Sequence, residues 1–167
     1  MVRPGYVLEH WRAVRSDAAQ AVREWSENER EFRAAPELMS FSELAWHVAE
    51  AGHILTGILL SGETDYRRAG FQEEKQRHAP RLEKGMSLAA LAGEMERLTA
   101  ERCAELAGQS ADWWAASVRK WSGEEMTRLE FLTFVVEHEL THRSQMFVCM
   151  RLKGMTPPTT RRMRAGK

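Results

Sequence analysis

The sequence predicts an all-α protein, an up-down four-helix bundle with long crossover connections. Apolar residues recur at spacings of three, four and seven along four long segments, which is the pattern of one helix face. Residues typical of helix ends stand at the borders of these segments. No segment alternates apolar and polar residues over the length of a strand, and no internal repeat is present. A bundle buries four such faces in one core.

The first two helices are separated by a proline. Pro4 suits a first helical turn, and apolar residues at helical spacing follow it, so the first helix is expected over about 5–33. Pro36 interrupts this pattern. The letters S-F-S-E at 40–43 form a capping box, in which serine and glutamate bind each other's backbone amides. The second helix is therefore expected from 41 to about 60.

The third helix lies between two long connections. Residues 63–85 are polar and contain a proline and two glycines, which indicates a long irregular connection that covers something or has a function. Ser87 can cap the third helix, and Gly108 can end it. The tryptophan-rich crossover at 110–122 is expected to be extended or irregular.

The fourth helix carries the clearest end signals. A second capping box at 127–130 starts it, and a glycine and two prolines end it after about Lys153. We assign residues 1–156 to a single helical domain, and 157–167 to a basic tail that is expected to be disordered.

Composition narrows the class of function. The 167 residues include 24 basic and 24 acidic side chains, whose charges cancel, so binding to nucleic acid is not expected. No apolar run is long enough to cross a bilayer. Cys103 and Cys149 lack metal-binding spacing and are expected to be reduced thiols. These features favour a cytoplasmic protein.

Three histidines point into the predicted core. On a helical wheel of about 100° per residue, His138 and His142 share the inward face of the fourth helix. His47 lies on the inward face of the second helix, in line with Leu44 and Ala51. A single inward histidine is usually an ordinary core residue, but three buried imidazoles are costly unless their lone pairs meet a common partner. The triad therefore predicts a divalent metal site with open positions.

Other residues near the triad have less certain roles. The letters H-E-L-T-H match the metalloprotease pattern, but no His, Asp or Glu follows His142 to supply the usual third ligand. Glu139 lies at the edge of the inward face and is a candidate general base of a hydrolase. Gln145 and Glu50 are candidates for residues beside the metal or in its pocket. The remaining histidines are assigned to surface or boundary positions: His10, His53 and His78.

Three stretches of the chain read as motifs: F-S-E-L-A-W-H-V-A-E from 41, V-R-K-W-S-G-E-E-M-T from 118, and H-E-L-T-H-R-S-Q-M from 138 with the terminator R-L-K-G-M-T-P-P from 151. Together they resemble the DinB/YfiT-like superfamily of four-helix-bundle metalloproteins. The resemblance covers nearly the whole chain. It implies that His47, His138 and His142 bind a divalent metal, most often zinc or nickel.

The resemblance also implies several chemistries. Members include thiol S-transferases that use a low-molecular-weight thiol, a thiol-dependent isomerase, and proteins described as metal-dependent hydrolases. We favour metal-activated transfer of a thiol to a small electrophile, with a hydrolase as the nearest alternative. A non-catalytic metal-binding or stress-response protein is the alternative from another class. An enzyme should have an open pocket at the metal, roofed by 61–86 or by 110–122.

The fourth helix carries a second apolar stripe, opposite His138. Its members lie within about 25° of one direction: Leu129, Val136, Leu140 and Phe147. If a bundle helix buries only one face, this stripe needs another partner, such as the 61–86 connection or a second chain. We therefore expect a homodimer through the fourth helix, with each metal site inside its own subunit.

Overall fold

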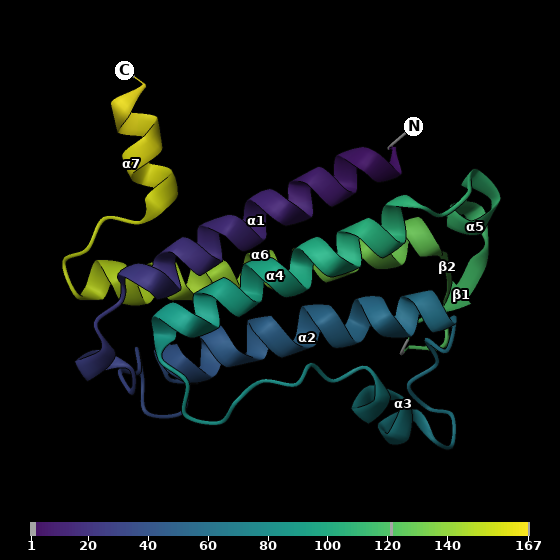
Figure 1. Cartoon of the computed structure of the whole chain (residues 1–167), viewed down its shortest axis with the longest axis horizontal. Coiled ribbons are helices and arrows are strands. Elements are labelled where there is room, and N and C mark those ends of the chain that lie inside the picture. Colours follow the sequence, from purple (N-terminus) through teal and green to yellow (C-terminus); the bar gives the residue numbers. More distant parts are fainter. Residues whose placement is uncertain (1–2, 121, 167) are drawn as a thin grey trace.

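The computed structural model describes residues 3–120 and 122–166, and four long helices form its body (Figure 1). They are α1 (Pro4–Glu24), α2 (Phe41–Ser61), α4 (Leu88–Ala107) and α6 (Arg128–Leu152). The shorter elements are the 3-10 helix η1 (Glu27–Glu29), α3 (Phe71–Arg77), α5 (Ala111–Ala115), the antiparallel strands β1 (Ser117–Arg119) and β2 (Glu125–Thr127), and α7 (Pro158–Ala165). The predicted all-α four-helix bundle is confirmed. No helix in this described part is long and apolar enough to cross a membrane.

The four long helices do not simply follow one another around the bundle. Each of α1 and α2 packs against both α4 and α6, so α1 lies diagonally opposite α2. In Figure 1, α2 and α4 run in one direction, and α1 and α6 run in the other. This is possible because the connection from 62 to 87 returns along the length of the bundle before α4 begins (Figure 1).

The two helices that carry the histidine triad begin at the predicted capping boxes. Ser40 Oγ accepts a hydrogen bond from the Glu43 amide at 3.3 Å, and the Glu43 carboxylate accepts one from the Ser40 amide at 2.7 Å. Thr127 and Glu130 form the same pair of bonds at 3.2 and 2.7 Å. These caps satisfy backbone amides that the first helical turn leaves without partners. They set the first residue of each helix.

The first helix is shorter than predicted, because it ends at Glu24 rather than near residue 33. Trp25 leaves the helix with an extended backbone, and its ring stacks on Phe41 with the ring centroids 4.0 Å apart. Phe32 packs against the same core from the loop that follows. Aromatic residues at helical spacing thus pack into the core from a loop. Periodicity alone cannot distinguish this arrangement from a longer helix.

The two predicted crossovers contain more regular structure than expected. The connection 63–85 includes α3, whose Phe71 and Glu74 are buried against the bundle. The crossover 110–122 includes the short helix α5 and the extended strand β1. Trp121 of this crossover lies outside the described residues.

The tail predicted to be disordered, 157–167, instead contains α7, although its last residue lies outside the described part. Helix α7 has few apolar residues to bury, and ion pairs with α1 hold it in place instead. Asp17 of α1 is 7% exposed and accepts hydrogen bonds from Arg143 and Arg162. Arg161 binds the carboxylate of the last residue of α1 at 2.6 and 2.8 Å. The domain boundary after residue 156 stays a prediction.

The second apolar stripe of α6 is largely covered within the chain. Val136 and Phe147 are only 3% and 6% exposed, and they belong to core clusters that α1 and α6 share. A helix in this bundle contacts two neighbours, here α1 and α2, and therefore buries two faces rather than one. The stripe gives no reason for a second chain, and the homodimer stays a prediction.

His53, assigned to the surface or a boundary by sequence, is buried between α2 and α4. The residue is 8% exposed, and its Nε2 lies 3.1 Å from Arg102 Nη2. Because a guanidinium only donates hydrogen bonds, His53 accepts through Nε2 and is neutral. Burial, and then the charge of Arg102, lower the pKa of His53 to about 4. His10 is exposed, and His78 is partly buried.

Mild acid is expected to weaken the fold through His53. In the unfolded chain this imidazole takes up a proton near its ordinary pKa of about 6.5, whereas in the folded chain its pKa is about 4. The free energy of unfolding is therefore unaffected by His53 above about pH 6.5. As the pH drops toward 4, protonation of His53 lowers it by roughly 2–3 kcal/mol. Urea unfolding of metal-free protein at several pH values, compared with His53→Gln, measures the contribution. Equal pH dependence in the two proteins would contradict it.

Candidate metal centre and adjoining pocket

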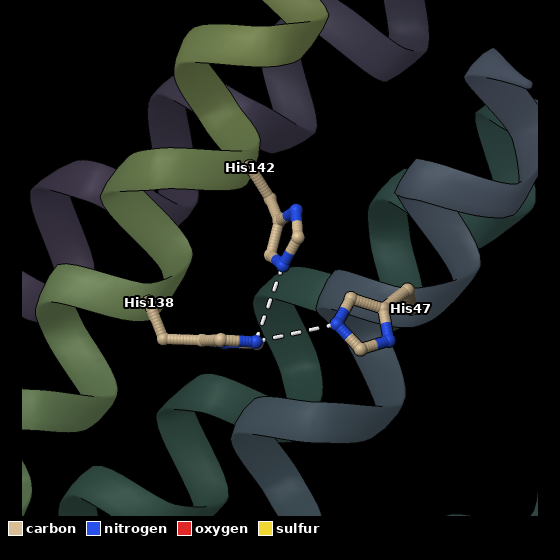
Figure 2. Close-up of side chains that lie close together, drawn as sticks. All are labelled: His47, His138 and His142. Atoms are coloured by element: carbon tan, nitrogen blue, oxygen red, sulfur yellow. Dashed lines mark hydrogen bonds between the residues drawn. The ribbon is translucent and has the colours of Figure 1, made fainter. Parts of the chain in front are cut away.

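Three imidazoles from two helices converge on one point, as Figure 2 shows. His47 comes from α2, and His138 and His142 lie one turn apart on α6. The Nε2 atom of His138 lies 3.3 Å from Nε2 of His47 and 3.2 Å from Nε2 of His142. One nitrogen from each ring lies within 4.8 Å of the other two. The structure thus brings together the three histidines that the sequence predicted.

This spacing fits a divalent ion. Two nitrogens each about 2.05 Å from a tetrahedral ion lie about 3.3 Å apart, which matches the separations of 3.3 and 3.2 Å around His138. Without an ion, His138 Nε2 carries at most one proton and can donate to only one of its two neighbours. A cation at the point of convergence would satisfy all three lone pairs.

Gln145, a predicted neighbour of the site, orients His142. Its side-chain oxygen lies 2.7 Å from His142 Nδ1. An amide oxygen only accepts hydrogen bonds, so His142 Nδ1 carries the proton and Nε2 keeps its lone pair toward the other rings. A partner of this kind fixes both the tautomer and the orientation of a metal-binding histidine.

Burial and neighbouring charges keep the imidazoles of His47 and His138 neutral. Burial, and then the neighbouring charge of His142, lower the pKa of His47. Burial, followed by His142, His47 and Arg15, lowers the pKa of His138 to about 4. Neutral imidazole is the form that binds a metal. These two side chains are therefore available as ligands at neutral pH.

A pocket of about 480 Å³ opens beside the triad. His47 and His138 line it, together with Glu50, another predicted site residue. Its apolar wall comes from α2 and α6: Ala51, Ile54, Leu55, Ile58 and Phe134. The connection between α2 and α4 contributes the opposite side: Tyr66, Phe71, Gln72 and Lys75. The expected roof from 61–86 is therefore present, and no described residue of 110–122 lines this pocket.

The sequence model of the DinB family matches residues 1–165. The chain belongs to the DinB family. Solved structures with the same fold include YjoA, a DinB-like protein from Bacillus subtilis. It is 22% identical with a TM-score of 0.66, over 90% of this chain and 94% of that protein. A comparison with curated proteins gives no match.

Two further structures share the DinB fold. YfiT from Bacillus subtilis, described as "a probable metal-dependent hydrolase with an unusual four-helix bundle topology", is 13% identical with a TM-score of 0.69, over 93% of this chain and 92% of YfiT. The mycothiol-dependent maleylpyruvate isomerase is 18% identical with a TM-score of 0.64, over 87% of this chain. This DinB-family chain spans 61% of the isomerase.

Glu139, the candidate base in this DinB-family chain, lies in the bundle core rather than at the pocket. It is 1% exposed and forms a two-pronged ion pair with Arg15 of α1, in which Nε donates to Oε2 at 2.9 Å and Nη2 donates to Oε1. A carboxylate held in this way has both oxygens engaged by a permanent cation. The pair joins α1 to α6 directly beside His138.

Gly52 leaves the space that this ion pair occupies. A Cβ atom at this position of α2 would lie 2.0 Å from Glu139 Oε1 and 2.3 Å from Arg15 Nη2. Neither Arg15 nor Gly52 was predicted from the sequence to support the site. Arg15 does lie on the apolar stripe of the first helix, four residues after Trp11, and a charged residue in such a stripe indicates a buried partner.

Proposed function

We propose that this DinB-family protein is a metal-dependent enzyme that transfers a small thiol to an electrophile. His47, His138 and His142 would bind one zinc or nickel ion, and the thiol would reach it through the adjoining pocket. The observation that carries the proposal is the joint geometry of the site, because two of the three converging histidines also line an open pocket of about 480 Å³.

Each group of residues at the site has a separate role in this proposal. The three imidazoles hold the ion, and Gln145 keeps the His142 lone pair directed at it. Ile54 and Phe134 form an apolar wall that removes water from around a bound substrate. A divalent ion held by neutral ligands supplies Lewis acidity, which lowers the pKa of a bound thiol or water.

Hydrolysis is the second candidate, and Glu50 is the residue that favours it. Arg15 engages Glu139, so Glu139 is not free to act as a general base. Glu50 instead lines the pocket together with His47 and His138. A carboxylate at this position could accept a proton from water. A purely structural or storage role agrees less well with an open pocket beside the triad.

Metal analysis and a paired assay test the proposal. Protein purified without chelator is expected to contain about one zinc or nickel ion per chain. The ion-loaded protein should catalyse transfer of a small thiol to a chlorinated bimane faster than hydrolysis of a nitrophenyl ester. His47→Ala should lose both metal and activity, whereas His10→Ala, at an exposed histidine outside the site, should keep both. Absence of stoichiometric metal after reloading would refute the site, and faster ester hydrolysis would favour the hydrolase.

A further inference from the structure

Helix α3 presents different side chains on its two sides. Phe71, Gln72 and Lys75 line the pocket. Glu74 is 1% exposed and lies 2.9 Å from His78 Nε2, and its other oxygen accepts from Arg77 at 2.7 Å. One side of α3 therefore carries a buried carboxylate, while the other side lines the pocket beside the triad.

The anchoring of α3 leaves little room for adjustment against α2. The His78 ring, which follows α3, lies so close to Gly57 of α2 that a Cβ there would be 2.6 Å from the ring. Gly70, the residue just before α3, has a φ of 83°, a value that favours glycine. Lys75 thus extends from a backbone whose position is set by packing.

Lys75 combines two features that no other basic residue of this connection has, a side chain without a partner and a place in the pocket. Three of the four arginines pair with an acid: Arg67 with Asp65 at 3.4 Å, Arg68 with Glu63 at 3.0 Å and Arg77 with Glu74 at 2.7 Å. The fourth, Arg81, lies outside the pocket, as does Lys84. The Lys75 side chain forms no ion pair or hydrogen bond with any residue that the structure describes. It is also the one lysine or arginine among the described residues that line this pocket.

The charges around the pocket favour an anion. Glu50 is the single acid among the described lining residues, and it forms no ion pair with Lys75. The positive charge of Lys75 therefore has no partner at the pocket, whether or not an ion is bound at the histidines. A ligand that carries a negative group would supply the missing charge.

We propose that the pocket selects a small molecule with a carboxylate at one end, which pairs with Lys75, and an apolar body that lies against Ile54 and Phe134. The reactive end of this molecule lies at the histidines, and that part of the inference rests on the proposed function. Lysine acts as a flexible point charge, so the carboxylate need not meet a fixed bidentate geometry. Lys75 is then the residue that determines substrate specificity.

Carboxylate recognition can be tested without metal and without a thiol. Lys75 is exposed. In a titration of metal-free protein followed by amide NMR, hexanoate is therefore expected to bind roughly two- to fivefold more tightly than hexanamide at low salt, as for an exposed ion pair. Lys75→Gln should remove this preference, and Lys75→Arg should keep it. Lys84→Gln is the matched control, because Lys84 is exposed and lies outside the pocket. Equal affinities in the wild type, or a preference that persists in Lys75→Gln, would overturn the proposal.

A second measurement separates this proposal from the proposed function. Mercaptohexanoate and mercaptohexanamide are titrated into the cobalt-loaded protein, where a thiolate-to-cobalt absorption band reports sulfur binding. The acid should again bind more tightly, and only in proteins that retain Lys75 or Arg at this position. Preference for hexanoate without a thiolate band would support carboxylate recognition and refute thiol activation. A thiolate band of equal strength for both compounds would refute the role of Lys75 alone.

Discussion

Replacing His142 by alanine is expected to abolish tight metal binding while leaving the helices folded. Loss of a residue that merely orients a ligand typically costs about 10–100-fold in metal affinity, so loss of a ligand itself should cost more. The bundle should survive, because its core clusters extend along all four long helices, whereas the triad joins only α2 and α6. Competition with a chromophoric chelator measures the affinity, and circular dichroism measures the helix content.

Two further variants provide reference values for the loss of metal affinity in His142→Ala. Gln145→Ala removes the partner of His142 Nδ1 but leaves all three ligands, so an intermediate loss of about 10–100-fold is expected. His10→Ala should bind metal as the wild type does. If His142→Ala were unfolded without metal, the ion would instead be a structural element of the fold, as in small zinc domains.

Replacing Glu139 by glutamine is expected to destabilise the protein strongly. The Arg15 and Glu139 side chains are 2% and 1% exposed, and removal of one charge leaves the other buried without compensation. Breaking a buried pair in this way typically costs about 3–5 kcal/mol. Urea unfolding of the metal-free protein measures this loss directly. Gly52→Ala should also destabilise, since its methyl group would overlap the ion pair.

The matched control removes both charges. Arg15→Met/Glu139→Met should recover much of the stability that Glu139→Gln loses, because two apolar side chains leave no buried charge without a partner. A general base would behave differently, since Glu139→Gln would then lose hydrolytic activity while keeping its stability. A loss of stability below about 1 kcal/mol, the range of an exposed pair, would contradict the structural role.

The ion pair is also a reason to expect that H-E-L-T-H in this chain is not a metalloprotease site. In that motif the glutamate must reach the substrate beside the metal. Here Glu139 points to Arg15, and the pocket carries a carboxylate from a different helix, Glu50. Two residues adjacent in sequence thus have different partners: His138 meets the other two histidines, and Glu139 meets Arg15.

The sequence alone determined the ends of α2 and α6 and the triad that they carry. Both capping boxes act between residues only three positions apart, so local chemistry decides where each helix begins. Once the first residue is set, a periodicity of 3.6 residues places His47, His138 and His142 on inward faces. Nitrogen ligands then indicate a metal without any knowledge of the remaining contacts.

Only the tertiary structure decided what surrounds that triad. Arg15 and Glu139 are 124 positions apart, and their pairing depends on which helices are neighbours. The pocket likewise depends on how α3 packs on α2. The position of α7 depends on an ion pair with Asp17 of α1. The second apolar stripe of α6 meets α1 because diagonal packing gives each long helix two neighbours. Periodicity shows that a face is buried, but the partner that buries it is a property of the whole chain.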